Sequence, residues 1–493
     1  MDPFTTLLRR LPALALALAL PSCGSSPATS SAASTAAGAG GATSATGTIT
    51  GGGGNGGASS GAGGGATSTT SGAGGTTGTG GDGGASTGTG GGAGGGTCAG
   101  DPACVCPDQQ LIAGYGEHDG LRAIDASHFA LVDTGTWAAY SALIDGLGLP
   151  FAALDALPLN RTGTKPTGAL AAALSTIVGY QGAFTWESGD QSVTYWVPQG
   201  LTGGTAGARE YVIVSWHYDE AHIADDPNPP ASGDKGVRLS FADVSGLGGD
   251  VPYRHVLLVE PNAASGFVSV NIHAGGLAFY GPYLYVADTS KGVRVFDTTR
   301  LMATSSAAMC SGQIGKVGNA YCAYGYSYAL PQVGGFYYPA GTHASCRAKF
   351  SFLSLDATTN PPSLVSGEYD NDVSLGIYSR LLRFPLDPGT SRLAADGAGA
   401  AHASEAFYAG NRNVQGAASV GGKFFLNATR YSGALSTGKV NQASKVYKAS
   451  AGKWAYMPEG IHHAKGSGRL YVNTEGSADM TRLVFATKAS AIP

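Results

Sequence analysis

Short runs of alternating apolar and polar residues dominate the chain from about residue 180 onward. They include residues 211–216, 237–241, 255–259, 283–287, 293–296, 350–355, 424–427 and 469–472. These runs are rich in β-branched and aromatic residues and are bounded by Gly, Asp, Asn and Pro, which is typical of strands. Because no long run with helical spacing interrupts them, the pattern predicts a sandwich, barrel or propeller and not an α/β sheet.

Two earlier segments carry apolar residues at helical spacing instead, at residues 137–145 and 168–177. The region that contains them, 98–180, is too short to form a large core of its own. We therefore expect a small helical, cysteine-bearing cap at 98–180, packed on a strand domain that spans 181–493.

A weak internal repeat favours a propeller among the all-β folds. Five times, a polar residue just ahead of a glycine opens a short apolar strand, and two or three further strands follow. The five polar residues are Gln199, His273, Gln332, Gln415 and Glu459. The repeat predicts five blades, and the long interval between the third and fourth openings leaves a sixth blade as the alternative.

The last repeat is one strand short, which predicts how the ring closes. Only three strands are expected between Glu459 and Pro493. A segment just ahead of the first blade, either 183–187 or 192–196, can supply the fourth. This pairing would leave no open sheet edge between the last blade and the first.

The second repeat, at 276–297, contains Leu-Tyr-Val-Ala-Asp-Thr followed by Gly-Val-Arg-Val-Phe-Asp. This segment resembles a blade of the NHL-type and lactonase-like β-propellers, a likeness that supports a fold and not an activity. Lactonase-like propellers hold calcium in the channel through Glu, Asn and Asp. The resemblance implies that Glu459, Asn413 and Asp288 would take that part here.

The five repeat openings form the first candidate site, because equivalent positions in a propeller surround the mouth of the central channel. Glu459 is a candidate general base or calcium ligand, and His273 a candidate acid, base or metal ligand. The alternative is that the Gln side chains hydrogen-bond neighbouring backbone and hold the ring together. A carboxylate pair for glycoside cleavage would need a partner for Glu459 from Asp288, Asp219 or Glu475.

A second cluster lies where a strand runs into a polar loop, at residues 215–222. We expect Trp216 and His217 to be borne by this loop near the channel face, where they can bind a ligand. His462, close to Glu459 in the sequence, is the remaining candidate ligand-binding residue. The alternative is a solvated loop with a packed Trp. No Gly-x-Ser-x-Gly motif occurs between residues 98 and 493, so nothing indicates a serine nucleophile elbow.

These candidates support two functions. The first is binding of a small molecule, glycan or protein at the channel face. The second is hydrolysis of an ester, lactone or glycoside by Glu459 and His273, with or without calcium. The chain has 29 Lys and Arg against 33 Asp and Glu, and this near-neutral balance does not indicate nucleic-acid binding. We expect a monomer.

The N-terminus, residues 1–23, has the composition of a signal peptide. Arg9 and Arg10 precede an apolar run at 11–20 that is too short to span a bilayer comfortably. The following Leu-Pro-Ser-Cys-Gly resembles the bacterial lipoprotein box, in which the cysteine, here Cys23, is acylated. Ordinary signal cleavage is the alternative. The resemblance implies an exported protein of the outer membrane or cell surface, similar to uncharacterised secreted bacterial propeller lipoproteins.

Residues 24–97 consist almost entirely of Gly, Ser, Thr and Ala. Such a segment cannot bury enough apolar surface to offset the entropy lost on ordering. We expect a flexible tether that gives a lipid-anchored domain its reach, with the lipid as the only membrane contact.

The cysteine count fits an exported chain. Of seven cysteines, six remain once Cys23 is set aside. An even number in an exported chain indicates disulfides, with fifteen possible pairings. The six are Cys98, Cys104, Cys106, Cys310, Cys322 and Cys346.

We expect the substitution Cys23→Ala to move the protein from the membrane fraction to the soluble fraction, because it removes the acylated residue. Fractionation of cells that express the wild type and the variant measures this. A wild-type protein that is already soluble would contradict the lipid anchor.

Overall fold

The structure is a computed structural model that describes residues 115–342, 346–370, 379–429, 432–476 and 481–493. The predicted signal peptide, the lipidation site Cys23, the tether and the first three cysteines of the body lie outside the described residues. No helix among the described residues is both long and apolar enough to cross a membrane.

Most described strands form five antiparallel units of four strands each. Unit 1 contains β6 (Trp196–Ala206), β7 (Arg209–Tyr218), β8 (Val237–Asp243) and β9 (Val251–Asn262). Unit 2 contains β11 (Leu277–Tyr280), β12 (Tyr283–Asp288), β13 (Gly292–Asp297) and β17 (Tyr328–Tyr337). Unit 3 contains β18 (Phe352–Asp356), β19 (Ser363–Gly367), β20 (Arg380–Pro385) and β22 (Glu405–Tyr408). Unit 4 contains β23 (Val414–Val420), β24 (Lys423–Ala428), β25 (Ala434–Gly438) and β26 (Lys445–Lys448). Unit 5 contains β27 (Pro458–Ala464), β28 (Arg469–Thr474), β29 (Leu483–Lys488) and β5 (Tyr180–Thr185).

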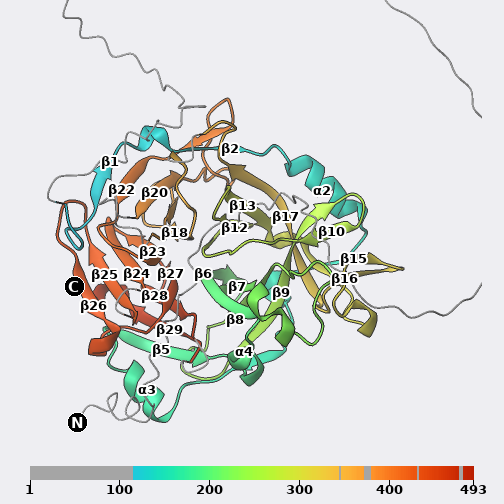
Figure 1. The fold of residues 1–493 in the computed structure, drawn as a ribbon, viewed down its shortest axis with the longest axis horizontal. Helices are drawn as coiled ribbons and strands as arrows, with labels where there is room; N and C mark the ends of the chain where they lie inside the picture. Colours follow the sequence, from blue (N-terminus) through green and yellow to red (C-terminus); the bar gives the residue numbers. More distant parts are fainter. Residues whose placement is uncertain (1–114, 343–345, 371–378, 430–431, 477–480) are drawn as a thin grey trace, which may run out of the picture. The chain divides into compact units, whose positions relative to one another are not determined.

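The units are arranged around a common centre, as Figure 1 shows. Their inner strands contact one another in the closed order β6, β11, β18, β23, β27 and back to β6. This is the β-propeller that the repeat predicts. The choice between five blades and six stays a prediction.

The presence of glycine in the repeat has a steric explanation. A Cβ atom on Gly276 would lie 1.8 Å from the Leu353 nitrogen of the next inner strand, and one on Gly460 would lie 2.3 Å from the Leu201 nitrogen. Glycine is required at these points because neighbouring backbones approach too closely for any side chain. The repeat therefore marks the places where the units meet at the centre.

Side chains near the ends of second strands also tie each unit to the next. Asn427 Nδ2 donates to the Glu459 carbonyl at 2.8 Å, which joins unit 4 to unit 5. Asn473 Nδ2 donates to the Gln199 carbonyl at 2.9 Å, which joins unit 5 to unit 1. Ser215 Oγ donates to the Ala274 carbonyl at 2.7 Å, which joins unit 1 to the segment that leads into unit 2.

The predicted closure of the ring is confirmed. β5 pairs with β29 from Thr185 opposite Leu483 to Tyr180 opposite Thr487. The strand predicted at 183–187 therefore completes the last unit, while the alternative segment, 192–196, leads into β6.

The prediction that Gln332 opens the third repeat is wrong. Gln332 lies in β17, the outer strand of unit 2, and pairs with Phe296 of β13. A Cβ atom on the nearby Gly334 would lie 2.5 Å from the Trp137 ring. This glycine therefore makes room for an aromatic side chain, and not for the backbone of a neighbouring inner strand. The inner strand of unit 3 is β18, which opens with Phe352.

The two predicted helices before residue 180 are confirmed as α2 (Trp137–Gly146) and α3 (Gly168–Leu174). The short strands of this region pair with the outer parts of the units. They are β1 (Arg122–Ile124) on β22, β2 (Ala130–Asp133) on β17, β3 (Phe151–Ala152) on β14 (Leu301–Ala303), and β4 (Arg161–Gly163) on β9. The described part of 98–180 thus runs along the outside of the ring, and its separate domain status stays a prediction.

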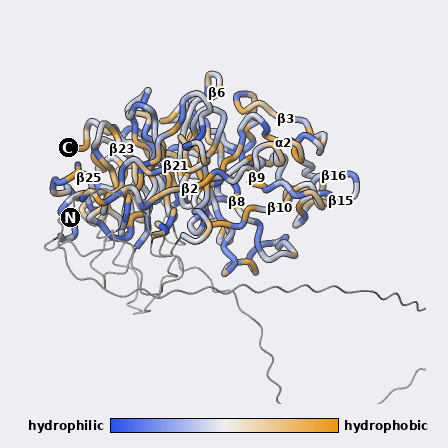
Figure 2. The backbone as a smooth tube through the Cα atoms, turned by 90° about the horizontal axis from the view of Figure 1, so that it is seen from above, coloured by the Kyte–Doolittle hydropathy of each residue, from blue (hydrophilic) through white to orange (hydrophobic). Residues whose placement is uncertain are grey.

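The remaining elements are short additions to the ring. β10 (Gly266–Ser269) pairs with β9, β21 (Ala400–His402) pairs with β2, β15 (Ile314–Val317) and β16 (Ala320–Ala323) form a hairpin, and α4 (Ser188–Ser192) precedes β6. A disulfide joins Cys310 to Cys322 beside that hairpin, which confirms one of the possible pairings. Figure 2 shows apolar stretches within the body of the fold and polar stretches along its connecting loops.

Candidate functional site

Four of the five predicted site residues lie at one edge of the ring, which we call the opening face. There β6, β23 and β27 begin with Gln199, Gln415 and Glu459 near their starts, and His273 lies ahead of β11. The second strand of each unit is antiparallel to the first, so it ends at this same face. Side chains that follow second strands therefore join the repeat openings there.

Glu459 is the centre of a carboxyl pair at this face. Its Oε1 accepts a hydrogen bond from Gln415 Nε2 at 3.0 Å. Its carboxyl group also lies within hydrogen-bonding reach of the carboxyl group of Glu475, the residue that follows β28. Two carboxylates this close repel each other, which favours a state in which the pair holds one proton. Of the three partners considered for Glu459, the structure selects Glu475.

The surroundings of Glu475 favour its protonated form. Burial raises the pKa of the Glu475 carboxyl group above its ordinary value, and the negative charge of Asp219 raises it further. The hydrogen bond to Glu459 and the charge of Arg482 act in the opposite direction but do not cancel the rise. Glu459 is almost completely buried, while Glu475 is half-buried and gives the pair its access to solvent.

The corresponding acids of two other units are neutralised. In unit 2, Asp288 Oδ2 accepts from Arg294 Nε at 2.9 Å. In unit 3, Glu368 Oε2 accepts from Arg380 Nε at 2.8 Å. Asp288 is the last residue of the second strand and Glu368 follows it, as Glu475 does, and both arginines lie in the third strand. In such buried pairs the guanidinium compensates the charge of the carboxylate, and the pair serves the fold.

Unit 5 has the same arginine, but it serves a different purpose. Arg482 Nε donates to the Glu475 backbone carbonyl at 3.1 Å, and its Nη1 donates to the Val193 carbonyl at 2.7 Å. The guanidinium therefore binds backbone and does not form the side-on pair seen in units 2 and 3.

His273 lies against a different partner. Its ring stacks on His217 with centroids 4.4 Å apart. Burial lowers the pKa of His273 to about 4, and burial followed by the His273 charge lowers the pKa of His217 well below its ordinary value. Both imidazoles are therefore neutral near pH 7, so neither is a ready proton donor there. The structure groups Glu459 with Gln415 and Glu475, and His273 with His217.

Two other predicted site residues lie elsewhere. Trp216 is not borne by a loop, because β7 continues to Tyr218 and buries Trp216 completely. Its Nε1 donates to Ser240 Oγ at 2.8 Å, inside unit 1. His462 lies toward the far end of β27, away from the opening face.

Sequence reasoning missed a buried chain of Ser240, His255 and Asp190. Ser240 Oγ lies 2.9 Å from His255 Nδ1, and His255 Nε2 lies 3.0 Å from both Asp190 oxygens. The order of groups resembles a nucleophile, base and acid. However, Ser240 is 0% exposed, so no substrate can reach it and the chain is part of the core. These residues are far apart in the sequence and belong to no motif that would have revealed them.

One of the calcium ligands implied by the lactonase resemblance does not fit. Asp288 Oδ2 accepts from Arg294 Nε at 2.9 Å, so this carboxylate is already paired with a cation. Among the residues that the structure describes, no group of three or more His, Cys, Asp or Glu side chains is arranged to hold a metal ion.

Comparison with known proteins adds a fold likeness. No family model and no curated protein matches this chain. Among solved structures, a glucose dehydrogenase is 12% identical and covers 66% of this chain and 96% of its own, with a TM-score of 0.29. A GH43_1 enzyme from Xanthomonas citri complexed with xylose is 11% identical and covers 65% and 93%, with a TM-score of 0.29. A β-xylosidase is 11% identical and covers 59% and 92%, also with a TM-score of 0.29. These distant likenesses carry no argument about activity. What can be stated is the fold: the chain folds as a β-propeller.

Proposed function

We propose that this protein is a hydrolase of ester or lactone bonds whose acid and base are the carboxyl groups of Glu459 and Glu475, since these groups lie too close together for the separation that glycoside cleavage requires. The observation that carries the proposal is the close approach of these two carboxyl groups at the opening face. Carboxyl groups that share a proton supply an acid and a base at the same pH.

The contrast between units supports a functional role for this pair. A structural acid at this position would be neutralised by its arginine, as in units 2 and 3. A carboxyl group whose pKa is raised by burial is a cost to the folded state, and such shifts cluster at functional sites. The pair is also less completely enclosed than the ion pairs of units 2 and 3, because Glu475 is half-buried while Asp288 and Glu368 are buried.

The reaction follows from the shared proton. The ionised carboxylate accepts a proton from a water molecule, whose oxygen bonds to the acyl carbon, while the protonated carboxyl group donates its proton to the carbonyl oxygen. In the tetrahedral intermediate, the group that took the water proton gives it to the leaving oxygen as the bond from that oxygen to carbon breaks. The carbonyl forms again and returns its proton to the other carboxylate, so the pair ends with one proton, as it began. Gln415 fixes the orientation of Glu459 through its 3.0 Å hydrogen bond.

Substitution of either acid by glutamine should abolish turnover. Glu459→Gln and Glu475→Gln preserve shape and remove the shared proton, so we expect the rate to fall by about 10² to 10⁴-fold. The measurement is release of nitrophenol from a panel of nitrophenyl esters. The wild type should show a bell-shaped pH profile, because activity needs one protonated and one ionised carboxyl group.

The matched control is Glu405→Gln, which removes an exposed carboxylate that pairs with Arg383 away from the site. It should retain wild-type activity. A wild type that binds members of the panel but releases no product would contradict hydrolysis and favour ligand binding alone. Unchanged turnover in both Gln variants would contradict the assignment of the carboxyl pair.

The pair should also leave a mark on stability. The raised pKa means that the folded state keeps a proton that the unfolded state has lost, so stability falls as pH rises through the window above the ordinary glutamate value. We expect Glu475→Gln to raise the melting temperature relative to wild type at pH 7 and to have little effect at pH 4. Thermal unfolding at the two pH values measures this, and an equal effect at both would show that the charge is not responsible.

A further inference from the structure

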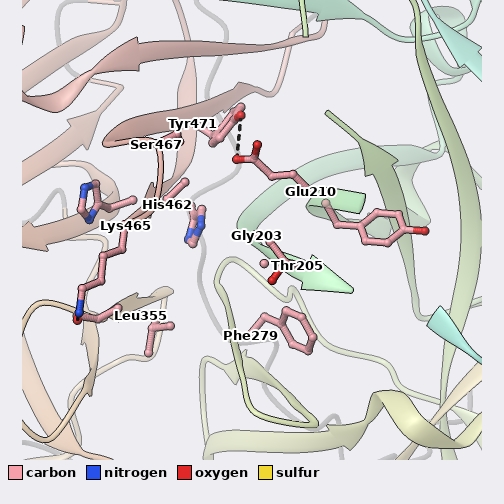
Figure 3. Close-up of a pocket in the computed structure, with 15 residues that line it drawn as sticks. Gly203, Thr205, Glu210, Phe279, Leu355, His462, Lys465, Ser467 and Tyr471 are labelled. Atoms are coloured by element: carbon pink, nitrogen blue, oxygen red, sulfur yellow. Dashed lines mark hydrogen bonds between the residues drawn. The ribbon is translucent and has the colours of Figure 1, made fainter. Parts of the chain in front are cut away.

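A cavity of about 460 Å³ lies at the end of the inner strands opposite the carboxyl pair (Figure 3). It is lined by the later residues of β6, β11, β18 and β27 and by the turn after β27. His462 is three residues beyond Glu459 in β27, which places the two about 10 Å apart along the strand. This volume is within the usual range for small-molecule sites, and the cavity is distinct from the opening face.

Two consecutive glycines open the cavity. A Cβ atom on Gly203 would lie 2.9 Å from the His462 ring, and one on Gly204 would lie 2.3 Å from the Phe279 ring. The bare backbone of β6 therefore lets both rings lie along the wall of the cavity. Any larger residue at these positions would displace the rings.

The lining combines an apolar wall with separate polar groups. Phe279, Leu355 and the ring of Tyr471 supply apolar surface. Glu210 Oε1 accepts from the Tyr471 hydroxyl at 3.2 Å. His462 is 5% exposed, and its Nδ1 has no hydrogen-bond partner among the described residues. Figure 3 shows the His462 imidazole close to Gly203, among the residues that line the cavity.

Charged groups of opposite sign lie on opposite sides of the cavity. Figure 3 shows Glu210 and Lys465 on opposite sides of it. Lys465 Nζ donates to the Ala357 carbonyl at 2.9 Å, which holds the ammonium group at the rim. Burial lowers the pKa of His462 to about 3, so this imidazole is neutral at ordinary pH. A carboxylate, an ammonium group and a neutral imidazole give no net charge, which suits a neutral ligand with several donors and acceptors.

We propose that this cavity binds a neutral polyhydroxylated ring of monosaccharide size. One face of the ring, made of C–H groups, lies against Phe279, because the negative face of an aromatic ring attracts such hydrogens. The hydroxyl groups reach Glu210, His462 and Lys465. Binding here is independent of hydrolysis at the carboxyl pair.

Saturation-transfer NMR on the full chain, with D-glucose, D-xylose and D-galactose as probes, tests the proposal. We expect transfer to at least one sugar. Affinity for that sugar should fall at least tenfold in Glu210→Gln and in Lys465→Ala, since a hydrogen bond to a charged group is worth that much or more. Lys465 is at the surface, so its removal should leave the fold intact. The control Lys316→Ala removes an exposed lysine of β15 and should leave the affinity unchanged.

Glu475→Gln separates this site from the proposed active site, because it should abolish hydrolysis and leave the sugar affinity unchanged. Absence of transfer to all three sugars would overturn the proposal. Preferential binding of L-alanine or acetate would overturn it as well, because the preferred ligand would then carry ionised groups in place of neutral hydroxyl groups. A sugar affinity that falls in Glu475→Gln but not in Glu210→Gln or Lys465→Ala would place the sugar at the opening face and would also overturn it.

Discussion

Gly276→Ala should be among the most damaging single substitutions in this protein, with a loss of about 3 kcal/mol or more in the free energy of unfolding. The added Cβ would lie 1.8 Å from the Leu353 nitrogen, 2.4 Å from the Phe352 carbonyl carbon and 2.6 Å from the Phe352 Cα. All three atoms are backbone, so no rotation of a side chain can relieve the contact. The inner strands of units 2 and 3 would have to separate at the centre of the ring.

Urea unfolding of the purified variant, or its yield as soluble protein, measures this effect. The matched control is Gly246→Ala, because a Cβ atom there meets nothing within 4 Å and the residue does not have a positive φ. That variant should stay within about 0.5 kcal/mol of wild type. Equal stability of the two variants would show that the inner strands do not approach as closely as described.

Asp190→Ala should cost about 3 to 5 kcal/mol, because it leaves buried cations without their counterion. Asp190 Oδ1 accepts from Arg238 Nη2 at 2.9 Å, and its other oxygen accepts from Arg161 Nη1 at 3.2 Å and from the Tyr253 hydroxyl. Arg238 is 5% exposed and cannot turn to water without opening the core. Urea unfolding at pH 7 measures the loss.

The control is Asp396→Ala, which removes a largely exposed carboxylate that pairs with His402 and should change stability by no more than about 1 kcal/mol. A small effect of Asp190→Ala would mean that the surrounding cations find water or other partners. That outcome would contradict the description of this cluster as core.

The same cluster predicts sensitivity to acid. Burial lowers the pKa of His255 to about 4, so the unfolded state binds more protons than the folded state between about pH 6.5 and 4. Stability should therefore fall as pH decreases through that window. Burial alone would raise the pKa of Asp190, but Arg238, His255 and Arg161 hold it below its ordinary value. Its stabilising contribution is lost at still lower pH, below the value of an unfolded aspartate.

The strand pattern predicted the fold because alternation along the chain reports which residues face the interior. Counting the strands after Glu459 was enough to predict that a segment before the first unit completes the last. The error at Gln332 has a physical basis. A glycine shows that something approaches the backbone, but it does not show whether that is a neighbouring strand, as at Gly276, or the ring of Trp137, as at Gly334.

The carboxyl pair was only partly predictable. Glu459 was identified from the repeat, and Glu475 was one of three partners considered for it. The choice depends on where a neighbouring arginine points, since Arg294 binds the side chain of its acid while Arg482 binds the Glu475 backbone. No periodicity reports that difference. Burial likewise decided the role of Trp216. The pairing of β6 with β7 continues past this residue to Tyr218, so Trp216 lies within the sheet and not in a loop.

The pairing of β5 with β29 has a consequence for how the chain folds. Thr185 meets Leu483 only after nearly the whole strand domain has been synthesised. Contacts between such distant segments form slowly, because the loop that joins them must first be closed at a large cost in entropy. Until that happens, unit 5 presents the unpaired edge of β29, to which another chain can add. This protein is therefore most prone to aggregate between its synthesis and the pairing of β5 with β29. Conditions that speed this pairing should improve its yield.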